Sequence, residues 1–376
     1  MAPDVEINTT TSYADVLVPT PQRPVHAGYA NPFSAPKLPS GGCRAGVVSL
    51  DACIIRSAES REGLLQQVKY LRTKNQQTQV ATGWANVSNG ALLQTAQELL
   101  SWEGNYSPYA FLERFYLREI YSKQRPGHAE YTGYFTPQIQ VRRTPNAEYR
   151  FPIYAPPRWA ERSLTRAQID AGALRGRGLE IGWTNDPVNL YFAHIQGSAI
   201  ARFEDGSESF MDFAASNNSH HASIGRYLRN QGYGGSLSNE RMRDWLHQHP
   251  DRIAEVLHHN PRYIFFKFTK SRPRTSTGMG VIPWHTVAVD DRFIPLGAVL
   301  LAEIPRIDHK GQIVGADWRL LFAQDRGKAI QGPGRLDFYT GAGALAEQAT
   351  YHLTGFRKTY LLVRKPGFTG DSFAGL

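Results

Sequence analysis

The sequence predicts a two-domain protein that is mainly β-structure with some α-helix. Its 376 residues suggest two domains, given the usual size of a domain. The chain has 18 Tyr, 18 Phe and 7 Trp together with 34 Gly and 23 Pro, a mixture that favours strands and turns over a helical bundle. Hydrophobic residues make up 41% of the chain, which is enough to build the cores of such domains.

The first part of the chain is expected to pass from a flexible leader through helices to strands. Residues 1–41 contain Pro, Thr, Ser and Ala without an apolar core, as a flexible leader does. Apolar residues at 64, 65, 68 and 71 predict an amphipathic helix over 60–72. Two more helices are expected between 89 and 120, in ALLQTAQELLSW and PYAFLERFYLREIY. From residue 129, AEYTGYFTPQIQVRRT alternates apolar and turn residues, which indicates strands.

The remainder alternates between helices and strands. A helix is expected to begin at SLTRAQIDAGAL, and strands follow in NLYFAHIQGSAIARFEDGS, where EDGS indicates a hairpin turn. LSNERMRDWLHQHPDRIAEVLHHN predicts helical structure with Ser238 as N-cap and Glu240 in the first turn. Residues 281–339 are predicted to be rich in strands, and KTYLLVRK closes the chain. No period of 20–50 residues repeats, which excludes a solenoid.

Charge and composition restrict the class of partner. The net charge of +9 suggests an acidic partner, such as nucleic acid, anionic lipid or an anionic polymer like a cell wall. The basic residues are scattered and form no zinc-finger or Walker pattern, so we expect no nucleic-acid partner. No apolar run of 18 or more residues is present, so the sequence predicts no transmembrane helix.

The chain has 2 cysteines, Cys43 and Cys53. No cluster of histidines accompanies them, so we expect no metal site. An even pair at short separation fits one disulfide in an oxidising compartment, and two buried thiols of a cytosolic protein are the alternative. We expect the disulfide.

Two aspartates flank a glycine-rich turn in AQDRGKAIQGPGRLDFYTG, residues 323–341. Asp308 and Asp317 lie in IDHKGQIVGADWR, where aspartate is an ordinary turn residue. Asp337 differs because it lies within the apolar strand pattern RLDFYTG, where an unpaired carboxylate is costly. Such a residue usually has a partner or a chemical role. Asp325 stands before the same turn, and the two carboxylates are therefore candidates for acid/base chemistry.

Several segments resemble a known family of cell-wall enzymes. VAVDDRFIPLG and QDRGKAIQGPGRLDFYTG resemble the two halves of the 3D domain, whose three aspartates match Asp290, Asp325 and Asp337. Upstream segments resemble the membrane-bound lytic murein transglycosylase A family; they are YTGYFTPQIQVRRTPNAEYRFPIYAPP (131–157), HIQGSAIARFEDG (194–206), SIGRYL (223–228) and YIFF (263–266).

The resemblance implies an architecture and a location. A double-psi β-barrel catalytic domain would be formed by residues 42–134 and 264–376, with the 3D region at about 281–345, and a second β-domain would be inserted over 135–263. The family acts on peptidoglycan glycan strands at the periplasmic face of the outer membrane of Gram-negative bacteria, without a cofactor. It is tethered there by a lipid whose cysteine is not visible in this chain, and other cell-wall enzymes are possible partners.

The reaction implied by the resemblance is cleavage of the β-1,4 bond between N-acetylmuramic acid and N-acetylglucosamine. Because the C6 hydroxyl of the same muramic acid attacks C1, one acid/base residue suffices and 1,6-anhydromuramic ends are formed. The family match assigns this role to Asp337. Asp325 would raise the pKa of Asp337 or orient the sugar, and Asp290 would brace the barrel turn.

Four residues in family-like motifs are candidates for contacts with sugar: Thr132, Tyr134, Gln196 and Gly197. Two other function classes are compatible with the same residues. Asp325 and Asp337 could be the two carboxylates of a β-1,4-glycan hydrolase, which activates water. Alternatively, the chain could be a wall-binding module without catalysis.

Overall fold

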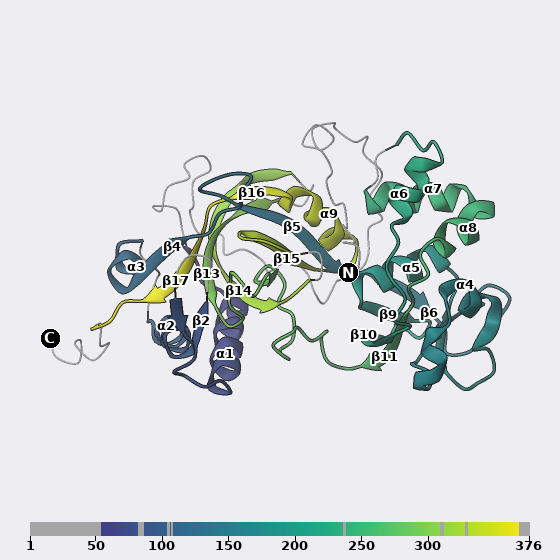
Figure 1. Cartoon of the computed structure of the whole chain (residues 1–376), viewed down its shortest axis with the longest axis horizontal. Helices are drawn as coiled ribbons and strands as arrows, with labels where there is room; N and C mark the ends of the chain where they lie inside the picture. Colours follow the sequence, from purple (N-terminus) through teal and green to yellow (C-terminus); the bar gives the residue numbers. More distant parts are fainter. Residues whose placement is uncertain are drawn as a thin grey trace. The chain divides into compact units, whose positions relative to one another are not determined.

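The computed structural model describes residues 54–81, 86–103, 106, 108–235, 238–308, 312–327 and 330–367. The predicted leader and the predicted disulfide between Cys43 and Cys53 lie outside these residues. The described chain divides into two compact units (Figure 1). We call Thr136–Pro273 the insert unit, and the described residues of 54–135 together with those of 274–367 the aspartate unit.

A nine-stranded sheet forms the framework of the aspartate unit within the described residues. Its strands before the insert are β1 (Ile54–Ile55), β4 (Phe115–Glu119) and β5 (Ala129–Thr136). Its strands after the insert are β12 (Thr286–Val289), β13 (Val299–Ile307), β14 (Ile313–Asp325), β15 (Arg335–Ala342), β16 (Gly355–Arg357) and β17 (Thr359–Arg364). The order across the sheet is β16-β5-β15-β12-β14-β13-β17-β4, and β1 pairs with β14. β2 (Gln79–Ala81) and β3 (Asn86–Ser88) form a separate antiparallel pair.

The helices of this unit are α1 (Ala58–Arg72), α2 (Asn89–Ser101), α3 (Pro108–Arg114) and α9 (Gly343–Leu353). The helix predicted over 60–72 is confirmed as α1, which begins with a capping box between Ser57 and Ser60. α1 packs closely on the sheet, because a Cβ added to Gly63 would lie 1.9 Å from the ring of Phe322. Glycine is therefore required at this crossing of helix and strand.

Both faces of the central strands are buried, as the alternation of side chains along a strand allows. On β14, Leu321 belongs to one hydrophobic cluster and Phe322 to the other. On β15, Leu336 and Phe338 both lie in the first cluster. Asp337 stands between them and therefore projects from the opposite face of the sheet.

The insert unit contains a four-stranded sheet in the order β11-β10-β9-β6 and a two-stranded pair, β7 with β8. The strands are β6 (Gln138–Val141), β7 (Phe151–Tyr154), β8 (Glu180–Thr184), β9 (Ala199–Phe203), β10 (Glu208–Ser216) and β11 (Ile264–Thr269). The α-helices are α4 (Arg166–Gln168), α5 (Pro187–Gln196), α6 (Ile224–Asn230), α7 (Asn239–Gln248) and α8 (Ile253–His258). Short 3-10 turns cover Trp159–Ser163 and Pro250–Arg252, and a π-helical turn covers Ile169–Ala173.

Two of the expected elements are of the wrong type. NLYFAHIQ, predicted as strand, lies in α5, because Asp186 caps the helix by accepting from Val188 N and Asn189 N and Pro187 occupies the first turn. The second half of PYAFLERFYLREIY, predicted as helix, is β4, which pairs with β17 along its whole length. Sheet pairing therefore overrides the helical preference of FYLRE.

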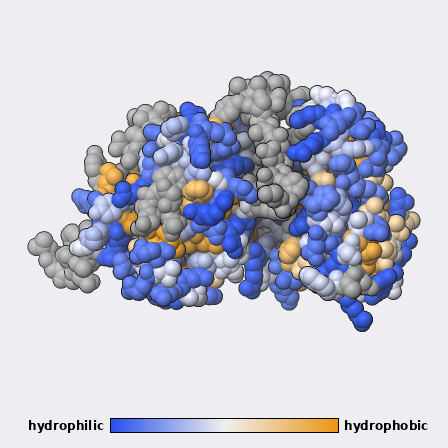
Figure 2. Space-filling model, in the orientation of Figure 1, coloured by the Kyte–Doolittle hydropathy of each residue, from blue (hydrophilic) through white to orange (hydrophobic). Residues whose placement is uncertain are grey.

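The surface in view is mostly hydrophilic on both units, with smaller hydrophobic areas (Figure 2). This agrees with the scattered basic residues and the net charge of +9. Among the described helices, none is both long enough and apolar enough to cross a membrane.

Candidate active site

The two candidate carboxylates lie on one line across three neighbouring strands of the aspartate unit. Ala288 of β12 is the Cα partner of Asp337 on β15 and also of Asp325 on β14. Two strand spacings separate the aspartates, so their Cα atoms are about 10 Å apart. β5, β14 and β15 can be followed in Figure 1. The sheet thus brings together two residues that the glycine-rich turn separates in the sequence.

Asp337 is half-buried and has a specific partner on the neighbouring strand. The hydroxyl of Thr132, on β5, donates a 2.6 Å hydrogen bond to Oδ1 of Asp337. Burial raises the pKa of Asp337 above its ordinary value, while the bond from Thr132 and the charge of Arg335 oppose this and the charge of Asp325 adds to it. Asp337 therefore keeps its proton to a higher pH than an exposed aspartate, as a general acid requires.

Asp325 is held by the segment that follows the insert unit. Its Oδ1 accepts hydrogen bonds from Ser276 N at 3.0 Å, from Ser276 Oγ at 2.7 Å and from Arg326 N at 2.9 Å. Ser276 was not predicted as a site residue, because nothing in RTSTGMG links it to a residue 49 positions away. Asp325 is thus a fixed carboxylate that also anchors the chain where it re-enters this unit.

Tyr134 places a phenol within electrostatic reach of both carboxylates. Its ring lies 5.1 Å from that of Tyr339, and its hydroxyl is buried with no hydrogen-bond partner among the described residues. Burial raises the pKa of Tyr134 well above its ordinary value, and the charges of Asp325 and Asp337 raise it further. The phenol is therefore a neutral hydrogen-bond donor at physiological pH.

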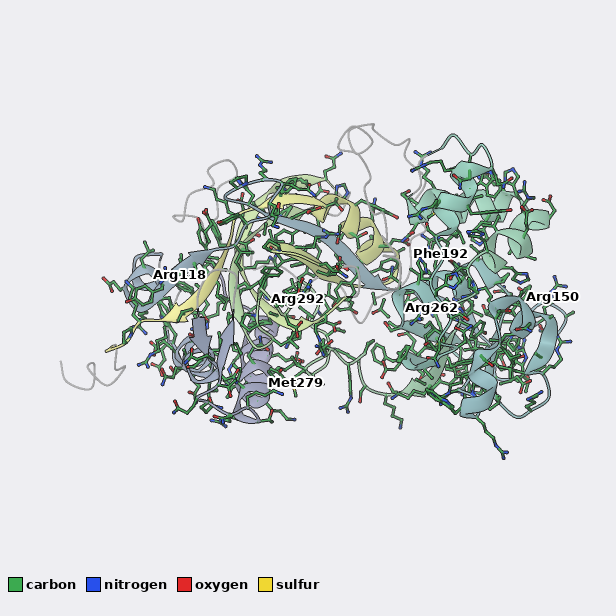
Figure 3. All side chains as sticks on the ribbon, in the orientation of Figure 1. Arg118, Arg150, Phe192, Arg262, Met279 and Arg292 are labelled. Atoms are coloured by element: carbon green, nitrogen blue, oxygen red, sulfur yellow. The ribbon has the colours of Figure 1, made fainter. Side chains whose placement is uncertain are left out.

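Asp290 is held by hydrogen bonds from two turns, and its predicted role as a brace stays a prediction. It is 6% exposed, and the guanidinium of Arg292 (labelled in Figure 3) donates to both of its oxygens, at 2.8 and 2.6 Å. The Gly332 N–H donates a further 2.7 Å bond from the glycine-rich turn. Although burial opposes ionisation, these bonds hold the pKa of Asp290 below its ordinary range. Asp290 joins two turns and leaves no oxygen free for acid/base work.

Two glycines near the site pack closely against the backbone of neighbouring segments. A Cβ on Gly133, between Thr132 and Tyr134, would lie 2.8 Å from Cα of Thr350 on α9. Gly334 has φ +67°, and a Cβ there would lie 2.3 Å from the carbonyl carbon of Tyr121. These glycines let β5 and the turn pack against their neighbours.

Gln196 and Gly197 belong to the insert unit, and their predicted contact with sugar stays a prediction. Gln196 is the last residue of α5. Gly197 has φ +76° and caps this helix in the left-handed conformation, with nothing within 4 Å of a Cβ built on it. Its local role is to end α5.

Asp317 is not the turn residue that the sequence predicted. It lies within β14, is 2% exposed and forms an ion pair with Arg306. Arg319 is 3.9 Å away and equally buried. The carboxylate is accommodated because two arginines lie beside it, of which Arg319 is buried and Arg306 is half-buried.

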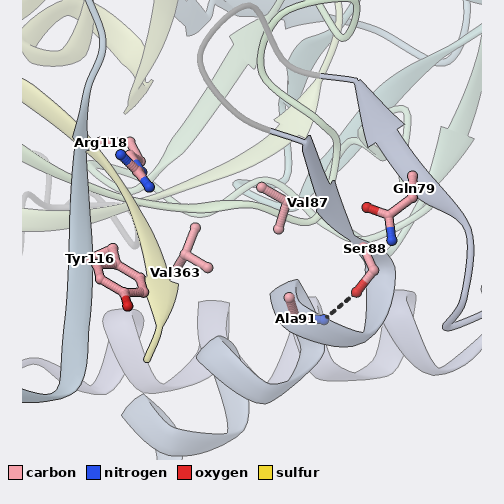
Figure 4. A pocket seen from close by; sticks show the side chains of 7 residues that line it. All are labelled: Gln79, Val87, Ser88, Ala91, Tyr116, Arg118 and Val363. Atoms are coloured by element: carbon pink, nitrogen blue, oxygen red, sulfur yellow. Dashed lines mark hydrogen bonds between the residues drawn. The ribbon is translucent and has the colours of Figure 1, made fainter. Parts of the chain in front are cut away.

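A pocket of about 350 Å³ lies elsewhere in the aspartate unit (Figure 4). Its lining consists of Gln79, Val87, Ser88, Ala91, Tyr116, Arg118 and Val363. No predicted site residue is among them, and Ser88 is engaged as the N-cap of α2 through a 3.1 Å bond from Ala91 N. Over the described residues, no group of three or more His, Cys, Asp or Glu is arranged to hold a metal ion.

Two protein-family models match this chain, one within the insert unit and one within the aspartate unit. The model described as MltA specific insert domain matches residues 158–267, and the model described as 3D domain matches residues 285–362. The second match contains Asp290, Asp325 and Asp337. The fold and the three aspartates thus define a 3D-domain protein.

Individual relatives narrow the assignment. The chain is 33% identical over 255 residues to membrane-bound lytic murein transglycosylase A of Escherichia coli K12, a match that covers 66% of this chain and 69% of the relative. It is 32% identical over 244 residues to the protein of the same name from Vibrio cholerae, covering 63% and 66%. The chain belongs to the membrane-bound lytic murein transglycosylase A family.

Solved structures agree with this assignment. The crystal structure of E. coli MltA with bound chitohexaose superposes with a TM-score of 0.69 at 25% identity, covering 90% of this chain and 96% of that chain. The membrane-bound lytic murein transglycosylase from Agrobacterium tumefaciens superposes with a TM-score of 0.65 at 27% identity, covering 81% and 92%. The predicted β-rich two-domain fold is confirmed.

Proposed function

We propose that this chain is a lytic transglycosylase that cleaves the β-1,4 bond between N-acetylmuramic acid and N-acetylglucosamine in peptidoglycan, with Asp337 as its acid/base. Residues 54–135 and 274–367 supply the catalytic domain. The observation that carries the proposal is the half-buried carboxyl of Asp337, bonded to Thr132 and with its pKa raised by burial. The names of its relatives and the chitohexaose bound to the E. coli protein support glycan as the substrate class.

The reaction needs no water. Asp337 donates its proton to the glycosidic oxygen as the bond from that oxygen to C1 breaks. The C6 hydroxyl of the same muramic acid attacks C1, and the Asp337 carboxylate takes the hydroxyl proton. The tethered hydroxyl has an entropic advantage over water of up to roughly 7–11 kcal/mol in the best intramolecular cases. Asp325, fixed by Ser276, contributes negative charge that favours the protonated form of Asp337 and the cationic transition state.

The names of the relatives support a location for this chain. They are named membrane-bound and come from Gram-negative bacteria, which supports a place in the cell envelope. We assign the chain to the periplasmic face of the outer membrane, where glycan strands are its partner and other cell-wall enzymes are candidates for association.

The products test the proposal. Digestion of purified sacculi in heavy-oxygen water should release 1,6-anhydromuramic ends that contain no solvent oxygen and weigh one water less than hydrolysed ends. The matched Asp337→Asn variant should release almost nothing. If the products were mainly reducible ends carrying the heavy label, the chain would be a two-carboxylate hydrolase instead. Binding without release by the unmodified protein would replace the proposal by the wall-binding module.

A further inference from the structure

Strands β5 and β15 form a ladder of three side-chain pairs on the face that carries Asp337. The pairs are Glu130 with Arg335, Thr132 with Asp337, and Tyr134 with Tyr339. The positions advance by two residues on each strand, so all six side chains share one face. The catalytic carboxyl therefore stands between an aromatic pair on one side and an ion pair on the other.

The ion pair is close but loosely held. Nη1 of Arg335 lies 3.8 Å from Oε1 of Glu130, which is beyond hydrogen-bond distance. Nη1 is buried without a hydrogen-bond partner among the described residues, and the side chain of Arg335 is 13% exposed. A guanidinium in this state is held by attraction to charge rather than by fixed geometry, and it responds to a new charge beside it.

That new charge appears during the reaction proposed above. Arg335 and Asp337 are two positions apart on one strand, about 7 Å between Cα atoms. When Asp337 gives its proton to the leaving oxygen, a carboxylate forms next to the guanidinium. The cation stabilises this carboxylate, and Glu130, from the other strand, weakens the effect by drawing the cation toward itself.

Within the described part of the chain, several groups face Asp337. β5 contributes Thr132 and the neutral phenol of Tyr134, β14 contributes Asp325, and β12 places the uncharged Ala288 opposite. Burial raises the pKa of Asp337 most, Thr132 and Arg335 lower it, and Asp325 raises it. Among the described residues, Arg335 is thus a cation that acts on this carboxyl.

We propose that Arg335 and Glu130 are a positioning pair that sets the pH at which the catalytic Asp337 holds its proton. Arg335 favours the carboxylate and so strengthens the acid, and Glu130 prevents the proton from being lost too early. The inference rests on the proposed function, since it concerns the acid of that reaction.

The two partners should shift the titration of Asp337 in opposite directions. Arg335→Gln removes the cation, so the alkaline limb of the pH profile of kcat/KM should move to higher pH by about 0.5–1 unit. Glu130→Gln removes the competing anion, so the alkaline limb should move to lower pH, by a smaller amount. Arg335→Lys retains the charge and should leave the limb close to that of the unmodified protein.

Titration of Asp337 in the free full-length protein, by NMR with carboxyl-labelled aspartate, measures the same shifts without turnover. Its resonance is identified by its absence from Asp337→Asn. This readout separates the inference from the proposed function, because it does not depend on the product. Arg252 and Glu255, an ion pair of 2.6 Å in the insert unit, provide matched controls whose glutamine variants should shift nothing. Shifts of the same sign in folded Arg335→Gln and Glu130→Gln, or no shift in either, would overturn the positioning pair.

Discussion

Thr132 and Asp337 are joined by a 2.6 Å hydrogen bond between neighbouring strands. The hydroxyl donates to Oδ1, which orients the carboxyl and leaves Oδ2 to carry the proton. Sequence similarity suggested Thr132 as a contact for sugar. In the structure, its hydroxyl donates a hydrogen bond to Asp337, the proposed acid. A residue predicted to bind substrate is thereby placed in support of the proposed catalytic group.

Removing this bond should affect rate and pH dependence together. Thr132→Val keeps the shape of the side chain and loses the donor, so we expect kcat to fall about 10- to 100-fold, a barrier increase of about 1.4–2.8 kcal/mol. The hydrogen bond lowers the pKa of Asp337, so its loss should move the alkaline limb to higher pH. Thr132→Ser retains the hydroxyl and serves as control. A valine variant with an unchanged pH profile would contradict this role.

The two aspartates should differ in their importance for turnover. Asp337→Asn should lower the lytic rate at least about a thousandfold, or ~4 kcal/mol in barrier, because amide nitrogen cannot donate a proton as an acid does. Asp325→Asn should lose less, since this carboxylate supplies charge and anchors Ser276. Turbidity loss of sacculi measures both rates, with circular dichroism as the check on folding. Activity above about a tenth in Asp337→Asn would show that the acid lies elsewhere.

Asp337→Asn should also stabilise the folded protein at neutral pH. Burial raises the folded-state pKa of Asp337, so a charged Asp337 lowers the free energy of unfolding. This cost is fully present above the folded-state pKa. The cost vanishes only when the pH falls well below the ordinary value of 3.8, where both states are protonated. We expect a higher Tm at pH 7, by roughly 2 °C or more, and almost no difference below about pH 3. Calorimetry at both pH values checks the sign, and equal gains at both would point to packing instead.

Sequence patterns predicted the strand-rich framework, helix α1 and the candidate acid, but the local environment of that acid required the structure. Asp337 could be singled out because its strand neighbours are apolar, and the structure explains this pattern, since Leu336 and Phe338 fill the core on the opposite face. Ser276 could not be found, because it lies in a turn outside the strands, and no local motif links that turn to Asp325 at the end of β14. Similarly, the apolar run NLYFAH suggested a strand. In the structure it is helical, because Asp186 caps the N-terminus of α5.

The close packing at Gly133 gives a further prediction. A Cβ there would meet the backbone of Thr350 on α9 at 2.8 Å. Gly133→Ala should therefore destabilise the fold by about 1–3 kcal/mol, as overpacking does. Chemical denaturation measures this loss, and Gly234→Ala, with nothing within 4 Å of the added carbon, is the matched control. Unchanged stability of Gly133→Ala would contradict this packing role.

His285 should make the stability of the protein depend on pH in the mildly acidic range. It is fully buried in the aspartate unit, where its Nδ1 donates to Leu320 O at 2.7 Å and Nε2 accepts from Ser57 Oγ at 3.3 Å. Burial lowers the pKa of His285 to about 4, against 6.5 in the unfolded chain. Between these values the unfolded state binds the proton and the folded state does not, so stability falls as pH falls from 6.5 to 4. The full loss amounts to about 3 kcal/mol.

Urea unfolding at pH 7.5, 6.5, 5.5 and 4.5 measures this slope. His285→Asn retains an N–H donor but cannot take up the proton, so its stability should depend less on pH over this interval. His194 in the insert unit, whose pKa burial also lowers, contributes a slope of the same sign, so part of the dependence should remain. The double variant with His194→Asn should remove that part as well. An unchanged slope in folded His285→Asn would mean that folding does not lower the pKa of this imidazole.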